Sequence, residues 1–126
     1  MRRKSASGIV VLDNSYNTNK EGFAASIDYL KLYPGRKFVV TPGIIELGAM
    51  TAEVHRELGK KLTGIEKVWV SRKGVEKWFE ESGARVEMIS DQVKLAEKIS
   101  GEMKNGDVLL IEGRISPVLK KRLANI

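Results

Sequence analysis

A cluster of polar side chains follows the apolar run Ile9–Leu12 and carries the most readable chemistry of this sequence. Its members are Asp13, Asn14, Tyr16, Asn17 and Asn19. Asp13 is suited to accept hydrogen bonds from ribose hydroxyls, and the Asn17 and Asn19 carboxamides match the donors and acceptors of a purine edge. The Tyr16 ring is suited to stack on a base, or to pack over the edge of a sheet. These residue types suit a loop that recognises a nucleotide, but by themselves they favour a local role for Asp13 and Asn19 in ordering the turn and capping a helix.

A second polar site follows the apolar run Val108–Ile111, where the chain continues as Glu112-Gly113-Arg114. The guanidinium of Arg114 presents a planar set of donors that fits a carboxylate or a phosphate. Arg114 fits equally well a structural role, in which it donates to the carbonyl groups of a nearby loop. The sequence alone leaves both interpretations open.

Neither a catalytic residue nor a metal site is expected in this chain. It has no cysteine and a single histidine, His55, which excludes thiolate chemistry and disfavours a metal cluster. His55 shares a helical face with Leu58 and Leu62, so a half-buried structural histidine is favoured over a proton carrier. The sequence contains no G-x-x-x-x-G-K-[ST] phosphate loop, no G-x-G-x-x-G after the first apolar run and no G-x-S-x-G. These residues therefore predict recognition rather than catalysis.

Length and composition indicate one globular domain. The chain has 126 residues, of which 42% are hydrophobic and 30% charged, as is ordinary for a soluble protein. No apolar run is long enough to span a membrane, and none follows the basic start, so neither a membrane span nor a signal peptide is expected. The formal net charge is +6, but the basic residues are spread among glutamates. That pattern favours solvated helix faces over a nucleic-acid surface.

Short apolar runs alternate with helical patterns along the chain. Strands are expected at residues 8–12, 37–40, 67–70, 86–89 and 108–111, and helices begin near residues 20, 51, 74, 92 and 117, with Thr51 as the N-cap of the second. Continuously apolar strands predict an α/β fold, with a mostly parallel sheet of about five or six strands covered by helices on both faces. Residues 1–7 are expected to be a disordered lead or a segment added by cloning, and residues 8–126 the folded domain.

Right-handed crossovers would place the loops after all of these strands at one edge of the sheet. These loops are residues 13–19, 41–48, 71–73, 90–91 and 112–114. A ligand site, if the chain has one, is expected at this edge, where exposed backbone N–H groups and helix N-termini converge.

Four segments, in order along the chain, resemble the Mur ligases. The stretch from Asp13 to Asn19 is similar to the family's D-D-S-Y-N-A-N motif, which opens its C-terminal domain. Tyr33-Pro34-Gly35 lies where those proteins turn into their second strand, and residues 44–48 with His55 resemble an M-x-E-L-G…H segment. Residues 105–114 resemble G-D-x-V-L-x-K-G-S-R. The resemblance covers nearly all of the chain from Gly8 and is closest to the members that join D-alanyl-D-alanine to a UDP-linked muramoyl tripeptide.

The resemblance implies a Rossmann-like three-layer domain of a larger cytoplasmic enzyme of peptidoglycan precursor synthesis. Such an enzyme uses ATP to phosphorylate a carboxylate and then joins an amine to it, forming an amide. The N-terminal and central ligase domains, with the magnesium ligands, are absent from this chain, which alone is expected to be inactive. Asp13, Asn14, Tyr16, Asn17 and Asn19 would contact ATP. Glu46, Gly113 and Arg114 would lie near the incoming amino acid or dipeptide, which is joined to a UDP-linked muramoyl peptide.

The sequence departs from the family pattern mainly on the amine-substrate side. Glu112 stands where the family has the lysine of K-G-S-R and brings the opposite charge. Asn14 replaces the second aspartate of the first motif, and Lys20 replaces a common proline. Glu46 also fits a structural ion pair with a neighbouring Lys or Arg. A stand-alone α/β binding or interaction module without catalytic activity therefore remains the alternative.

Overall fold

The structure, a computed structural model, describes residues 1–17 and 19–126. A six-stranded sheet in the order β1-β2-β6-β3-β4-β5 forms its centre. The strands are β1 (Arg2–Lys4), β2 (Val10–Asn14), β3 (Lys37–Thr41), β4 (Lys67–Val70), β5 (Val86–Met88) and β6 (Val108–Glu112). Only β1 is antiparallel to its neighbour, and the pairs β2–β6, β6–β3, β3–β4 and β4–β5 are all parallel. The predicted α/β fold with a mostly parallel sheet is confirmed.

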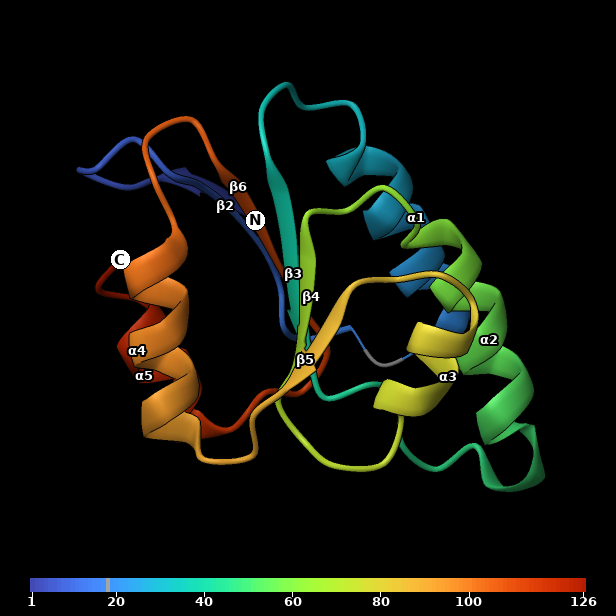
Figure 1. The fold of residues 1–126 in the computed structure, drawn as a ribbon. Helices are drawn as coiled ribbons and strands as arrows, with labels where there is room; N and C mark the ends of the chain where they lie inside the picture. The colour runs from blue at the N-terminus through green and yellow to red at the C-terminus, as the bar shows by residue number, and fades with distance from the viewer. Residues whose placement is uncertain (18) are drawn as a thin grey trace.

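Helices cover both faces of this sheet. One side carries α1 (Lys20–Leu30), α2 (Thr51–Lys61) and α3 (Glu76–Glu81), and the other carries α4 (Gln92–Glu102) and α5 (Pro117–Leu123). Figure 1 shows these two layers to the right and left of the strands. A short 3-10 turn, η1 (Gly48–Met50), leads into α2. The three-layer arrangement confirms the predicted Rossmann-like architecture.

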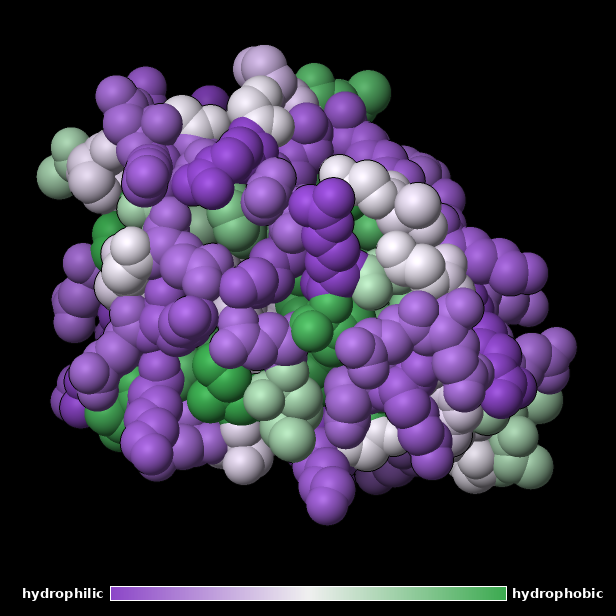
Figure 2. All heavy atoms as spheres, viewed as in Figure 1, coloured by the Kyte–Doolittle hydropathy of each residue, from purple (hydrophilic) through white to green (hydrophobic). Residues whose placement is uncertain are grey.

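Each face of the sheet buries its own hydrophobic core. Along β6, Val108 and Leu110 pack with the α1–α3 layer, whereas Leu109 and Ile111 pack with α4 and α5. This alternation is the two-residue period of a strand, and both faces are apolar because helices remove both from water. The view in Figure 2 shows a mostly hydrophilic exterior with small hydrophobic areas between polar side chains. The apolar runs of the sequence thus fix the central strands, whose ends carry the candidate site.

Two local expectations are wrong. Arg2–Lys4 is ordered as β1, paired with Val10–Leu12, where a disordered lead was expected. Backbone pairing holds this edge strand, and Arg3 also donates to the carbonyl of Leu123 over 2.7 Å. Thr51 is not an N-cap: η1 runs straight into α2, so Thr51 is already helical and its hydroxyl donates back to the Gly48 carbonyl over 2.7 Å.

Candidate functional site at the carboxyl edge of the sheet

The carboxyl ends of β2, β6, β3 and β4 lie side by side, as their parallel register requires. The connections that leave them, around residues 15–19, 113–116, 42–47 and 71–74, therefore meet at one edge. Of the first connection, Thr18 lies outside the described residues. In the described part of the chain, no group of three His, Cys, Asp or Glu side chains could hold a metal ion. No helix there is long and apolar enough to cross a membrane.

Asp13 and Asn19 order the loop that follows β2. The Asp13 carboxylate accepts a hydrogen bond from the backbone N–H of Ser15 over 2.9 Å, and the Asn19 side chain accepts one from Gly22 over 2.7 Å. Asn19 has an extended backbone and is the N-cap of α1. The local roles that the sequence left open for these two residues are therefore present in the structure.

Asn14 and Tyr16 differ sharply in their surroundings. The Asn14 amide nitrogen donates to the Ser26 hydroxyl of α1 over 2.6 Å. Tyr16 is 77% exposed, and its hydroxyl donates to the Asn14 side-chain oxygen over 3.3 Å. The ring thus stands in solvent beside an anchored asparagine, where its face is open to a planar ligand.

Asn17 is tied to the end of β6. Its amide nitrogen donates to the Glu112 carboxylate over 2.8 Å, across 95 residues of sequence. Glu112 is 1% exposed, and its second oxygen, Oε1, has no hydrogen bond to any described residue. Burial raises the pKa of the Glu112 carboxyl to about 7, against the opposing effect of polar groups on Ser26, Asn17 and Asn14. The sequence flagged Glu112 only as a departure from the family motif and gave no sign of this buried contact.

Gly113 turns the chain out of the sheet immediately after Glu112. Its φ is +86°, a left-handed conformation that favours glycine. Its backbone N–H donates to the Asn14 carbonyl over 3.2 Å, so the β2 and β6 loops are joined directly. Arg114 then projects into solvent and makes no hydrogen bond or ion pair with another described residue.

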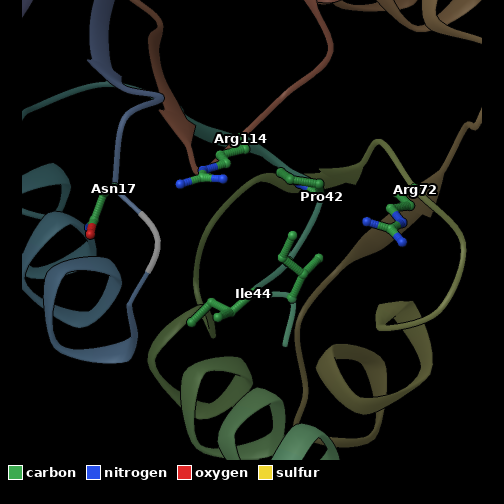
Figure 3. Close-up of a pocket in the computed structure, with 7 residues that line it drawn as sticks. Asn17, Pro42, Ile44, Arg72 and Arg114 are labelled. Carbon is green, nitrogen blue, oxygen red and sulfur yellow. The ribbon is translucent and has the colours of Figure 1, made fainter. Parts of the chain in front are cut away.

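Arg114 and Asn17 line a hollow of about 60 Å³, together with Pro42, Gly43, Ile44, Ile45 and Arg72. In Figure 3, Arg114 and Arg72 lie on either side of Pro42, with Ile44 below them. Two wider hollows adjoin it, of about 250 and 330 Å³, and Arg72 and Pro42 line both. The site thus combines apolar walls with two guanidinium groups, which suits a ligand that carries a carboxylate or phosphate.

The sequence placed the 71–73 loop at this edge but did not single out Arg72. The signal was present, because Arg72 and Lys73 form a basic pair one residue beyond the end of β4. Both side chains are exposed. No motif distinguished this pair from the other basic residues of the chain.

Glu46 lies in the segment that follows β3, away from Asn17. It is exposed, lines the 250 Å³ hollow and has a φ of +65°, which is unusual for a residue other than glycine. No ion pair with a described residue is formed by Glu46. The structure therefore brings Asn17, Gly113 and Arg114 together and leaves Glu46 at the rim of a neighbouring hollow.

His55 anchors the same segment from α2. Its Nε2 accepts a hydrogen bond from the backbone N–H of Ile44 over 3.0 Å, and its Nδ1 lies 2.6 Å from the Thr51 carbonyl. Nδ1 therefore carries the proton of a neutral ring. Burial lowers the pKa of this histidine below 6.5. The expected structural role is present, although the side chain is fully rather than half buried.

Residues 1–115 match the family model described as Mur ligase, glutamate ligase domain. The chain is a Mur ligase C-terminal domain. It is 36% identical over 52 residues to a UDP-N-acetylmuramoyl-tripeptide–D-alanyl-D-alanine ligase of Haemophilus influenzae, a match that covers 41% of this chain and 11% of that protein.

Solved Mur ligases share the fold over almost the whole chain. The MurF ligase of Thermotoga maritima, crystallised in complex with ADP, superposes with a TM-score of 0.82 at 29% identity, over 98% of this chain and 29% of that one. MurF from Acinetobacter baumannii gives a TM-score of 0.76 at 16% identity, over 99% of this chain and 28% of that one. This Mur ligase domain therefore spans less than a third of the length of these relatives.

Proposed function

We propose that this Mur ligase domain works as the closing domain of an ATP-dependent amide ligase, of the kind that builds peptidoglycan precursors in the cytoplasm. One observation carries the proposal. Asn17, from the loop after β2 that resembles the family's nucleotide-contacting motif, lines one hollow together with Arg114 and Arg72. This hollow lies at the carboxyl edge of the sheet. A fold relative that matches 98% of the chain was crystallised with ADP.

In this proposal the β2 loop binds the adenosine of ATP. Tyr16 supplies an exposed ring for the base, and Asn17 and Asn19 supply polar groups for its edge. Asp13 and Asn14 shape the loop through their contacts with Ser15 and Ser26. The phosphates and magnesium belong to the other domains of the ligase, because this loop carries no phosphate-binding motif.

The opposite side of the hollow receives the amine substrate, an amino acid or dipeptide. Arg114 and Arg72 pair with its carboxylate, while Ile44 and Ile45 contact its apolar side chains. Gly113 sets the direction of Arg114, and Glu46 at the rim is placed to meet the substrate's ammonium group. A UDP-linked muramoyl peptide would supply the acyl group through the other domains. Closure would then protect the acyl phosphate from water.

The test is a ligase assay on the full protein that carries this domain. With ATP, a UDP-muramoyl tripeptide and D-alanyl-D-alanine, we expect phosphate release coupled to amide formation. Tyr16→Ala should raise the KM for ATP about tenfold, since stacking is worth about 1–3 kcal/mol per base. Arg85→Ala, on an exposed side chain elsewhere, is the control. The 126-residue chain alone should show no turnover, and ATP hydrolysis by it would contradict the proposal.

A further inference from the structure

The Asn17–Glu112 contact has features that a simple loop anchor does not require. Glu112 is a carboxyl group buried at the end of the central strand, with one oxygen bonded to Asn17 and the other without a hydrogen bond to any described residue. Leaving a buried carboxylate half satisfied is unfavourable, and a neutral side chain would avoid it. Stability therefore does not explain why an acidic group occupies this position.

The Asn17 carboxamide is also fixed from the side of α1. A Cβ added at Gly22 would overlap its nitrogen, oxygen and carbon, so the amide lies directly against the helix backbone at that glycine. The Asn17 oxygen accepts only a long contact, 3.4 Å, from the backbone N–H of Asn19. The amide thus lies between Gly22 and Glu112, while Asn17 also lines the hollow seen in Figure 3.

An ionised carboxylate only accepts hydrogen bonds, so it binds the nitrogen end of an asparagine amide and leaves the oxygen end for other partners. Once Glu112 holds one N–H of Asn17, the amide cannot turn over, so its oxygen stays an acceptor and one N–H remains as a donor. At the same position of a bound purine, adenine presents the amino group N6 as a donor, whereas guanine presents the acceptor O6. The amide orientation therefore distinguishes the two bases.

We propose that Glu112 is a positioning residue that orients the Asn17 carboxamide, so that the loop accepts a hydrogen bond from the base and selects adenine over guanine nucleotides. The selection rests on the proposed function of this loop, whereas the orientation of Asn17 does not. Glu112 acts through Asn17 and does not reach the ligand, since its side chain is buried.

The protonation state of Glu112 decides how strictly the amide is held. A protonated carboxyl group has an O–H donor, and it can then bind the Asn17 oxygen with the amide rotated by half a turn. Polar groups that act on this carboxyl come from β2, its loop and α1, namely Asn14, Asn17 and Ser26. The adjoining elements also carry the charged residues Asp13, Lys20, Glu21 and Arg114. None of these four is among the groups that shift the pKa of Glu112. The strict orientation should therefore develop as pH rises through about 7.

The first measurement is NMR of the 126-residue chain without nucleotide. The side-chain amide signals of Asn17 should shift with pH, with a midpoint near 7, and this titration should vanish in Glu112→Gln. Asp28→Asn is the matched control, because it removes an exposed carboxylate from the outer side of α1. An Asn17 amide that does not titrate, or that titrates equally in Glu112→Gln, would overturn the proposed orientation.

The second measurement is the affinity for ATP and GTP, followed by chemical-shift titration at pH 8 and pH 6. We expect wild-type and Asp28→Asn chains to prefer ATP, more strongly at pH 8, and Glu112→Gln to lose about tenfold of that preference at pH 8. An unchanged preference in Glu112→Gln would overturn the selection. If Glu112→Gln does not fold, the pH dependence of the wild-type chain tests the selection instead. A preference for ATP that is the same at pH 6 and pH 8 would then overturn it. A wild-type chain that binds neither nucleotide would overturn the selection together with the proposed function, while the Asn17 titration still decides the orientation by itself.

Discussion

The imidazole of His55 accepts a hydrogen bond from the backbone N–H of Ile44, over 3.0 Å. This contact ties α2 to the segment after β3, whose residues Ile44 and Ile45 line the hollow at the carboxyl edge of the sheet. Gly43 is needed for the approach, because its φ is +82° and a Cβ there would overlap Val75. The apolar wall of the site is thus held by a neutral histidine that is itself buried.

Protonation of His55 should therefore destabilise the domain. Burial lowers its folded-state pKa below 6.5, so the unfolded chain takes up the proton more readily than the native one. The stabilisation is complete above pH 6.5 and is lost as pH falls through the folded-state pKa. The measurement is urea unfolding from pH 8 to pH 5, comparing wild type with His55→Gln, which cannot titrate but can still accept from Ile44. As pH falls, wild type should lose more free energy of unfolding than His55→Gln does. If the difference between the two chains stays constant with pH, His55 does not have the lowered pKa inferred for it.

Central strands, helices and the ligand-binding edge were predictable because they depend on apolar runs and on crossover handedness. Strand β1 was not, because Arg2-Arg3-Lys4 has no apolar signal and pairs through its backbone with β2. Helix α2 begins near residue 51 as expected, but Thr51 is its first helical residue and not its N-cap, because η1 precedes the helix without a break.

Within the site, the residue types of the β2 loop were visible in the sequence, whereas their partners were not. Asn17 and Glu112 are 95 residues apart, and only the register of β2 with β6 brings their loops together. Arg72 was overlooked for a different reason: its loop was expected at this edge, but no motif distinguished Arg72 from the other basic residues of the chain. The roles predicted for individual residues in binding ATP and the amine substrate stay predictions.

Glu112 should have the opposite effect of His55 on the pH dependence of stability. Its pKa is raised from 4.5 to about 7 in the folded state, so the native protein binds a proton more tightly than the unfolded chain between these values. Its contribution to stability is present below pH 4.5 and is lost as pH rises through 7. Glu112→Gln should be more stable than wild type at pH 8, by up to about 3 kcal/mol, with the gain shrinking toward pH 4.5. Thermal unfolding of both chains across this pH range measures the gain. If the gain in stability of Glu112→Gln over wild type is smaller at pH 8 than at pH 5, the expected sign is contradicted.

Gly22→Ala should separate helix stability from loop geometry. Alanine favours a helix interior over glycine by about 1 kcal/mol, but the new Cβ would displace the Asn17 amide from its place against α1. Gly101→Ala in α4 is the matched control, because a Cβ there meets nothing within 4 Å. Calorimetry should show Gly101→Ala stabilised by about 0.5–1 kcal/mol and Gly22→Ala without that gain. Only Gly22→Ala should also weaken ATP binding; equal stabilisation with unchanged ATP affinity would show that Asn17 tolerates the change.

The two guanidinium groups at Pro42 should act on the carboxylate of the amine substrate. Arg114 and Arg72 line the same hollow and form no ion pair with any described residue, so both are available to an anionic ligand. In the full ligase, Arg114→Ala and Arg72→Ala should each raise the KM for the amine substrate about tenfold and leave the KM for ATP nearly unchanged, because a charge-assisted hydrogen bond is worth about 1.5–3 kcal/mol. Arg114→Lys should recover only part of the loss, since lysine lacks the planar fork. A substrate whose carboxylate is replaced by an amide should bind wild type and variants alike. If the arginine variants still discriminate between acid and amide as wild type does, the carboxylate is bound elsewhere.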